Sequence, residues 1–469
     1  MVIIKKERFV SDKSVLYISD DNETFRENVF DTKYKNLGAA VDIGTTSIAI
    51  GLFDMETKKS IGNMTQTNCQ TNYGCDVMMR IMHCVNGKEQ LLHDILIEQI
   101  ENILEKIISD NKINKLKSDI KSSDIIKKMC IAGNTTMCHI FLNKDVSGLK
   151  GAPFSTAYKG VVRTESKKIG FKKYDIPEIV ILPNIHSHVG ADAASVLCQE
   201  KLYREDVNEL AIDIGTNAEI ILNNSGKIFV ASTAAGPAFE GKGIESGMRA
   251  KAGAINTVKI SRVNGNIILG MLDDGTKSYP QGICGSGLID TIAELMKAGL
   301  LTKNGYLLTK EEALKQNVNI NLCERIYRGD KKRGNSFLLS AENDVVVTQN
   351  DIRNVQLAKG AIQAGVEILL EKSGISMSEI DCIKIAGVFG KFINKSSAML
   401  FGLLPKYPEK LEFIGNAAGN GVAKALFDDN FVLDMEKLVE KVKHIELADE
   451  NNFQSKFMNA MELKEWYYN

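Results

Sequence analysis

Apolar and polar residues follow two different periods along this chain, and segments of the two kinds alternate. Residues 37–54 alternate as strands do, on either side of a short turn that contains glycine. Residues 91–110 and 351–373 repeat apolar positions every three or four residues, which predicts two long helices, and Gly374 supplies a typical end for the second. Strands and helices in alternation predict an α/β architecture with mixed sheets.

The length of 469 residues is more than one ordinary hydrophobic core requires, so we expect more than one lobe. Residues 1–36 are polar and charged, with one strand-like stretch at 14–19, and are expected to form a short N-terminal extension. Regular alternation begins at residue 37 and begins again near residue 208. The expected division is therefore a first lobe over 37–207 and a second lobe over 208–469.

The overall composition and charge indicate in which compartment the protein is expected and which partners it is not expected to bind. It is 44% hydrophobic and 25% charged, as in soluble globular proteins, and its net charge is −1. A chain without net positive charge is not drawn as a whole to nucleic acid, and no apolar run reaches the ~20 residues that cross a bilayer. The start of the chain does not resemble a signal peptide. We therefore expect a cytoplasmic protein that binds neither nucleic acid nor membrane.

Nine cysteines are scattered along the chain. An odd number without an export signal argues against a disulfide framework. The sequence has no C-x2-C pair, so the usual ligand sets of structural zinc and of ferredoxin-type clusters are missing. We expect the cysteines to be ordinary thiols and the protein to hold no iron–sulfur cluster.

Two short stretches repeat the same chemistry in the two halves of the chain. Residues 40–54 read AVDIGTTSIAIGLFD and residues 211–224 read AIDIGTNAEIILNN. In each, a strand ends on an aspartate and turns through glycine into a second strand, so that successive backbone N–H groups can surround an anion. The aspartates, Asp42 and Asp213, can hold hydrated Mg²⁺ or orient a water. Two such hairpins predict a duplicated fold whose turns face each other around one nucleotide.

A third glycine turn follows a buried strand late in the chain, at residues 386–390. With the turns at 42–46 and 213–217, it gives the order phosphate turn, phosphate turn, adenosine turn. In this order the chain resembles the superfamily of acetate and sugar kinases, heat-shock seventy chaperones and actin (ASKHA). The resemblance implies an actin-like ATPase fold with two duplicated lobes around a nucleotide cleft.

Longer motifs narrow the resemblance. The stretches IAGNTTMCHIFL, LPNIHSHVGADAASVL, STAAGPAFEGKGIESGMRAKAGAI, GICGSGLID and FIGNAAGNGVAKAL are similar, in this order, to the C-terminal ATPase region of the reductive activators of corrinoid proteins. The similarity extends from about Leu37 to the C-terminus. It implies a protein that couples ATP to the one-electron reduction of a corrinoid protein from inactive Co(II) to Co(I), the form that takes part in methyl transfer.

The sequence departs from this family pattern in two places. Such activators usually begin with a [2Fe–2S] domain held by four cysteines, whereas residues 1–37 contain no cysteine. The electron is therefore expected from a separate low-potential donor. The adenosine turn of the family usually reads Gly-Gly-Phe-Gly, and here Val388 takes the second place between Gly387 and Gly390. This valine either weakens adenine binding or points away from the nucleotide.

The resemblance assigns roles to individual residues. Asp213 and Asp42 are expected to be catalytic and to hold Mg²⁺ through water, with Glu219 and Glu240 as supporting acids. The expected nucleotide-binding residues are Gly44, Thr45, Thr46, Gly215, Thr216, Asn217, Gly285, Gly387 and Gly390.

Other polar residues near these motifs have simpler interpretations. Asn134 can cap the helix that follows it or face the nucleotide or partner, and Cys284 is explained equally well as a small buried thiol. His186 and His188 are interpreted as loop residues, because no third metal ligand is in view.

Two other functions remain open at this level. A related ATPase can remodel a partner protein without electron transfer, and a small-molecule kinase can share the same fold. The ATP-driven activators of 2-hydroxyacyl-CoA dehydratases are further relatives, in which cysteines hold a cluster at a dimer interface; Cys130 and Cys138 compare only loosely with those. The sequence does not decide whether the protein forms a homodimer.

Overall fold

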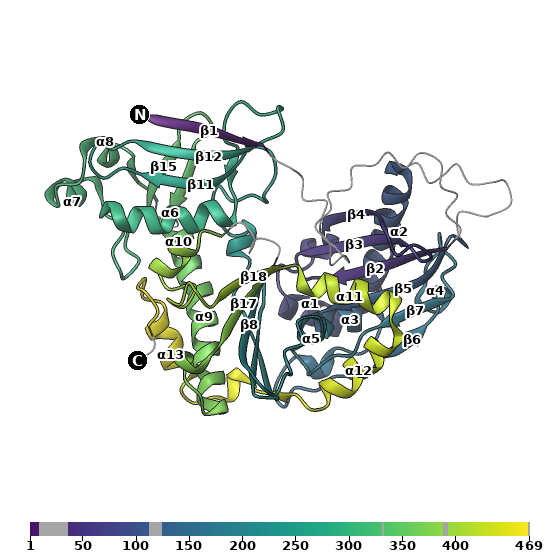
Figure 1. The fold of residues 1–469 in the computed structure, drawn as a ribbon. Coiled ribbons are helices and arrows are strands. Elements are labelled where there is room, and N and C mark those ends of the chain that lie inside the picture. Colours follow the sequence, from purple (N-terminus) through teal and green to yellow (C-terminus); the bar gives the residue numbers. More distant parts are fainter. Residues whose placement is uncertain (9–35, 112–123, 331–332, 388–392, 468–469) are drawn as a thin grey trace.

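The computed structural model describes residues 1–8, 36–111, 124–330, 333–387 and 393–467. Two six-stranded sheets form the centres of two lobes (Figure 1). The first sheet has the order β4-β3-β2-β5-β7-β6. Its strands are β2 (Leu37–Ile43), β3 (Ser47–Asp54), β4 (Ser60–Thr67), β5 (Ile126–Gly133), β6 (Val162–Thr164) and β7 (Glu178–Ile181).

The second sheet has the order β18-β17-β8-β9-β10-β19. Its strands are β8 (Asn208–Ile214), β9 (Ala218–Asn224), β10 (Lys227–Thr233), β17 (Cys382–Ala386), β18 (Leu411–Gly415) and β19 (Lys443–His444). In both sheets an antiparallel meander of three strands continues into two parallel strands on the side of its first strand. The predicted duplication and the actin-like α/β fold are therefore confirmed.

Long amphipathic helices cover the sheets. The two predicted long helices are present as α2 (Glu89–Asp110), which contacts β3 and β4, and α9 (Gln349–Ser373), which contacts β9 and β10. A capping box of Thr348 and Asp351 starts α9, and Gly374 ends it in the left-handed conformation with φ +76°. The first lobe also contains α1 (Val77–His83), α3 (Thr135–Phe141), α4 (Ser166–Ile169) and α5 (Ala191–Gln199).

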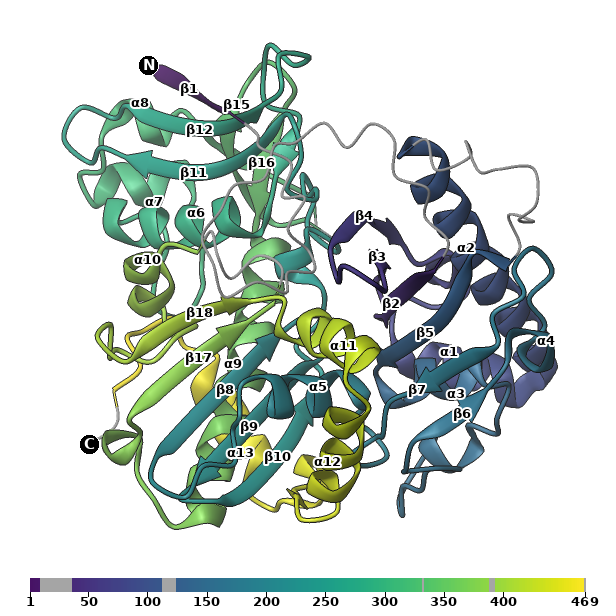
Figure 2. The same cartoon turned by 45° about the vertical axis from the view of Figure 1, so that its right-hand side comes forward.

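The C-terminal part of the chain crosses back to the first lobe. Helix α11 (Ala417–Phe427) contacts β2, β5 and α5, and α12 (Asp429–Val439) follows it along the same lobe (Figure 2). Ala417, Val422 and Val432 belong to the hydrophobic core that contains the first sheet, a core that also includes some residues of the second sheet. In space, the lobes therefore do not divide the chain at residue 208 alone, because residues 417–439 complete the first one.

Two small sheets extend the second lobe. A four-stranded sheet has the order β1-β12-β11-β13, with β1 (Val2–Arg8) parallel to β12 (Ile267–Asp273). The expected N-terminal extension thus begins with a strand of the second lobe, while the predicted strand at 14–19 lies outside the described residues. The other strands are β11 (Ala254–Ile260), β13 (Gly282–Ile283), β14 (Ile326–Arg328), β15 (Asn335–Ser340) and β16 (Val345–Thr348).

The remaining helices pack around these sheets. Helix α6 contacts β11 and α10, and α13 contacts α9 close to the C-terminus (Figure 1). Their bounds are α6 (Gly285–Ala298), α7 (Lys310–Lys315), α8 (Ile320–Cys323), α10 (Lys395–Leu400) and α13 (Phe453–Ala460). Of the helices that the structure describes, none combines the length and the apolar character that a membrane crossing requires.

Candidate active site

The two predicted phosphate turns meet in the cleft between the lobes. Thr46, after β2, and Thr216, after β8, are buried, and their hydroxyl oxygens lie 2.7 Å apart in a hydrogen bond. Each turn is closed by a short backbone hydrogen bond, from Gly44 N–H to the Ser47 carbonyl at 2.9 Å and from Gly215 N–H to the Asn217 carbonyl at 3.1 Å. The duplicated hairpins therefore form one site.

Four carboxylates cluster beneath these turns. Asp42 and Asp213 end the first strand of each hairpin, Glu219 lies opposite Asp213 on β9, and Asp192 lies in the first turn of α5. Burial raises the pKa of Asp42 to about 8, with Asp192 and Asp213 adding to the effect, and raises that of Asp213 to about 7 with help from Asp192. The pKa of Glu219 is raised well above its usual value, first by burial and then by Asp192 and Asp213.

Asp192 is the residue that sequence reasoning missed. It lies within the motif GADAASVL, where an acid in the first turn of a helix is explained fully by the helix dipole. Burial raises its own pKa to about 6, although the backbone N–H of Ala193 donates to it at 2.8 Å. Its charge acts on all three of the other acids, so it occupies the centre of the cluster.

The two supporting acids differ in their contacts. Glu240 Oε1 accepts a hydrogen bond from the Thr216 hydroxyl at 2.8 Å, which joins it directly to the second phosphate turn. Glu219 is buried and accepts a hydrogen bond from Ser232 at 3.3 Å. Glu240 is thus the acid in contact with the turn, and Glu219 belongs to the cluster of four carboxylates.

A buried arginine supports the first phosphate turn from behind. Arg80, on α1, has no exposed surface, and its guanidinium donates to the Thr45 carbonyl, to the Gly74 carbonyl at 3.2 Å and to Gln70 Oε1 at 3.3 Å. Burial lowers its pKa to about 10. In the sequence this arginine resembles an ordinary surface cation on a short helix, so only the fold reveals its position.

Two asparagines fix the same turn. Asn134 caps α3 through the Met137 N–H, as one of its two interpretations expected, and also donates to the Thr45 hydroxyl at 2.8 Å. Asn68 donates to the Gly44 carbonyl at 2.9 Å. The first turn is therefore hydrogen-bonded by side chains from outside it, namely Asn68, Arg80 and Asn134.

Gly387, the described glycine of the third turn, lies against the second phosphate turn. Gly387 has φ +111°, and a Cβ there would lie 2.6 Å from the Ile214 carbonyl oxygen, so no side chain fits. Val388 and Gly390 lie outside the described residues. At Gly285 a side chain would overlap the Phe239 carbonyl oxygen, so this glycine brings the start of α6 against the turn that carries Glu240.

The cysteines were expected to be ordinary thiols, and His186 and His188 to be loop residues. All nine cysteines are free thiols, and burial raises the pKa of Cys130 to about 12. The ring of His186 stacks on that of His444 at a centroid distance of 4.1 Å, so a third histidine does approach the predicted loop. Within the described part of the chain, no three His, Cys, Asp or Glu residues form a metal-binding group.

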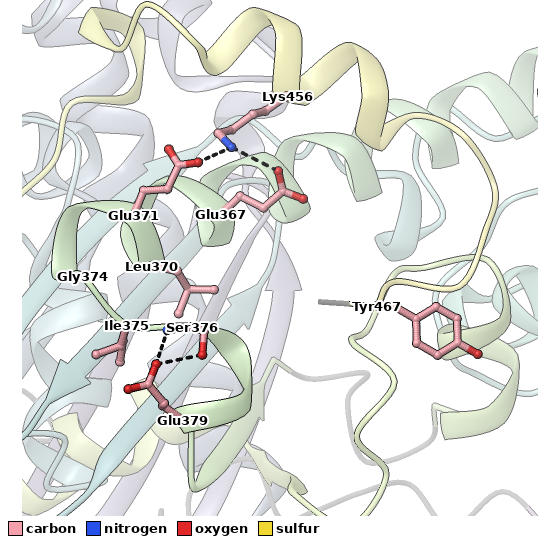
Figure 3. Close-up of a pocket in the computed structure, with 9 residues that line it drawn as sticks. All are labelled: Glu367, Leu370, Glu371, Gly374, Ile375, Ser376, Glu379, Lys456 and Tyr467. Carbon is pink, nitrogen blue, oxygen red and sulfur yellow. Dashed lines mark hydrogen bonds and ion pairs between the residues drawn. The ribbon is translucent and has the colours of Figure 1, made fainter. Parts of the chain in front are cut away.

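A surface groove of about 580 Å³ lies between the end of α9, α13 and Tyr467 (Figure 3). Lys456 neutralises its two glutamates on α9, with an ion pair to Glu371 at 2.5 Å and one to Glu367 at 3.6 Å. Glu379 caps the turn at Ser376. These groups satisfy one another, and the groove shares no residue with the cleft.

The duplicated sheets and the facing turns define an ASKHA-type nucleotide-binding protein. Residues 207–468 match the family model described as the C-terminal domain of RACo, the ASKHA domain, and residues 37–205 match the RACo middle region. The chain belongs to the RACo family. The suspected family and fold are thereby confirmed.

Named relatives agree with this assignment. The chain is 34% identical over 434 residues to the "Corrinoid activation enzyme RamQ" of Eubacterium limosum, covering 90% of this chain and 70% of that protein. It is 25% identical over 457 residues to the "[Co(II) methylated amine-specific corrinoid protein] reductase" of Methanosarcina barkeri, covering 92% and 77%. A solved structure, "Reductive activator for corrinoid,iron-sulfur protein", superposes with a TM-score of 0.82 at 32% identity, covering 93% and 67%.

Proposed function

We propose that the protein is an ATP-dependent reductive activator of a corrinoid protein that receives its electron from a separate low-potential donor. The observation that carries the proposal is the hydrogen bond between Thr46 and Thr216 above a cluster of carboxylates, in a chain whose relatives are named for corrinoid activation. It joins the two phosphate turns into one site, as an ATPase that closes on its nucleotide requires.

The residues of the cleft suit Mg²⁺ and a triphosphate. Burial raises the pKa of Asp42 to about 8 and that of Asp213 to about 7, and a bound cation would favour the charged form of both. Mg²⁺ is commonly held by one or two carboxylates together with water and phosphate oxygens, so these two aspartates would hold it through water. The N–H groups and hydroxyls of residues 44–46 and 215–217 would bind phosphate, with Gly285 and the turn at Gly387 and Gly390 completing the nucleotide site.

Asp213 is the residue to which we assign the reaction step. It would orient the water that attacks the terminal phosphate, with Asp42 on the opposite lobe. One ATP and one water give ADP and phosphate, while one electron from the reduced donor converts Co(II) to Co(I). We expect the protein to bind the Co(II) form of its partner more tightly than the Co(I) form, so that the reduced product leaves. This preference by itself favours Co(II), so the free energy of ATP has to offset it.

The test is an anaerobic assay of Co(I) absorbance. The substrate is the Co(II) corrinoid protein of a methylamine methyltransferase system, with titanium(III) citrate as the donor. Donor and ATP together should give Co(I), and ATP without donor should give none. If donor plus ATP yields no more Co(I) than donor alone, the redox proposal fails; continued ATP hydrolysis stimulated by the partner would then favour the remodelling ATPase.

The same preparation tests the expected cofactor content and compartment. We propose that the protein carries no iron–sulfur cluster of its own; about one iron and one acid-labile sulfide per chain would contradict this. The nine free thiols fit a reducing cytoplasm. Analytical ultracentrifugation of the same sample measures whether the protein is a monomer or a homodimer.

A further inference from the structure

A tightly folded loop, residues 240–249, connects the second phosphate turn to the edge of the cleft. Gly241 has φ +76°, and a Cβ there would lie 2.6 Å from the Met248 carbonyl oxygen, so the loop returns closely on itself. Met248 N–H donates to the Ile283 carbonyl at 2.8 Å, and Asn354 donates to the Gly243 carbonyl at 2.7 Å. The loop is therefore held from both sides in one conformation.

Two cations on this loop are half-buried and have no ion-pair partner in the described part of the chain. They are Lys242 and Arg249. The neighbouring acid, Glu240, accepts a hydrogen bond from the Thr216 hydroxyl at 2.8 Å and also acts on both cations, so a single carboxylate faces two positive charges. Burial of long cationic side chains without a paired anion is unfavourable, so their arrangement indicates a ligand that supplies negative charge.

The first lobe faces these cations. Burial, Arg249 and Arg80 lower the pKa of Lys242, whereas Glu240 and Cys75 raise it. Arg80 is itself bonded to the carbonyl of Thr45 in the first phosphate turn. Positive charge from both lobes therefore gathers beside the turns, while the four acids Asp42, Asp192, Asp213 and Glu219 lie together beneath them.

We propose that Lys242 and Arg249 bind the terminal phosphate of a nucleoside triphosphate and so distinguish it from the diphosphate. This inference rests on the proposed function. The backbone N–H groups of the two turns are shared by any phosphate chain, whereas charge-assisted hydrogen bonds from the loop require a further anion. After hydrolysis and release of phosphate, Glu240 is the one carboxylate left beside the two cations among the described residues, and their mutual repulsion favours opening of the cleft.

The experiment compares the dissociation constants of ATPγS and ADP, both with Mg²⁺, by calorimetry. Lys242→Gln and Arg249→Gln should each weaken ATPγS at least about tenfold and ADP less than about threefold. Lys259→Gln is the matched control, because Lys259 is an exposed lysine of the same lobe, on β11; it should leave both constants unchanged. Lys242→Arg and Arg249→Lys retain the charge and should keep most of the preference for the triphosphate.

The outcomes separate this inference from the proposed function. If the wild-type protein binds ATPγS and the two neutral variants bind it equally well, or lose ATPγS and ADP to the same extent, the terminal-phosphate role is wrong and the activator proposal stands. If the wild-type protein binds neither nucleotide, both fail. Thermal unfolding of each variant shows whether it is folded. The charge-retaining variants Lys242→Arg and Arg249→Lys allow the affinities for ATPγS and ADP to be compared with a smaller change to the loop.

Discussion

Replacement of Asp213 by asparagine should make the nucleotide-free protein more stable while removing its activity. Asp213 lies half-buried in the cleft, and among the described residues its carboxylate has no hydrogen-bond donor. Burial, together with the charge of Asp192, raises its pKa from 3.8 to about 7. The charged form is thus unfavourable in the folded protein, and the neutral amide relieves this cost.

The size and the pH dependence of the effect follow from that pKa. A shift of about three units corresponds to about 4 kcal/mol as an upper limit, at 1.36 kcal/mol per unit. The unfolded chain ionises Asp213 near pH 3.8 and the folded protein only near pH 7, so the wild-type protein loses stability as the pH rises through this interval. Water in the cleft reduces the cost, and we expect Asp213→Asn to gain about 1–2 kcal/mol at pH 8 and about 1 kcal/mol less than that at pH 5.

The assay is urea unfolding at pH 5 and pH 8 without Mg²⁺ or nucleotide, together with ATP turnover at pH 8. Turnover should fall roughly 10²-fold, with ATP affinity changed only a few-fold. Asp429→Asn is the control, because Lys128 at 3.0 Å and Arg163 at 3.3 Å lower the pKa of this aspartate, so its neutralisation should cost stability at pH 8. Asp213→Asn that is less stable than wild type at pH 8, or that hydrolyses ATP at the wild-type rate, would refute the reasoning.

Two further substitutions test the contacts around the cleft. Arg80→Met should lower the free energy of unfolding in urea by about 3 kcal/mol, because it leaves the buried carbonyls of Thr45 and Gly74 without a donor. Arg80→Lys should not recover this stability. A loss below about 1 kcal/mol for Arg80→Met would contradict the role. Burial, His186, His188 and Lys159 lower the pKa of His444 from 6.5 to about 3, so stability is full above pH 6.5 and is lost as the pH falls. His444→Phe keeps the stacked ring and should reduce the loss of thermal stability between pH 7 and pH 4, whereas an unchanged acid profile would show that another group is responsible.

The duplicated fold was predictable because its signal is local. In each hairpin the alternation of strand residues, the aspartate and the glycine turn all fall within about 15 residues. The long helices α2 and α9 show an amphipathic pattern over their full length. The facing of the two turns followed from the duplication. Thr46 and Thr216, which the sequence assigned only to phosphate binding, are the residues through which the two turns touch.

Other parts of the site depend on long-range packing that no local pattern encodes. Asp192 is an ordinary first-turn acid until α5 is placed between the two aspartates, and Arg80 is an ordinary helix cation until α1 is placed behind the first turn. The return of α11 to the first lobe is of the same kind, since its apolar face is compatible with either lobe. Topology, rather than residue type, decided all three.

The crossing segments explain how events in the cleft can reach a partner protein. Residue 415 ends β18 of the second sheet, and α11 of the first lobe begins at residue 417. Gly415 has φ +63°, a left-handed conformation that glycine adopts without strain, and its carbonyl accepts a hydrogen bond from the Gly387 N–H at 3.0 Å. Because α11 contacts β2, whose end carries Asp42, we expect a change in the distance between the turns to move α11 relative to β18. Coupling of this kind is reciprocal. If a bound partner changes the affinity for nucleotide by some factor, bound nucleotide must change the affinity for the partner by the same factor.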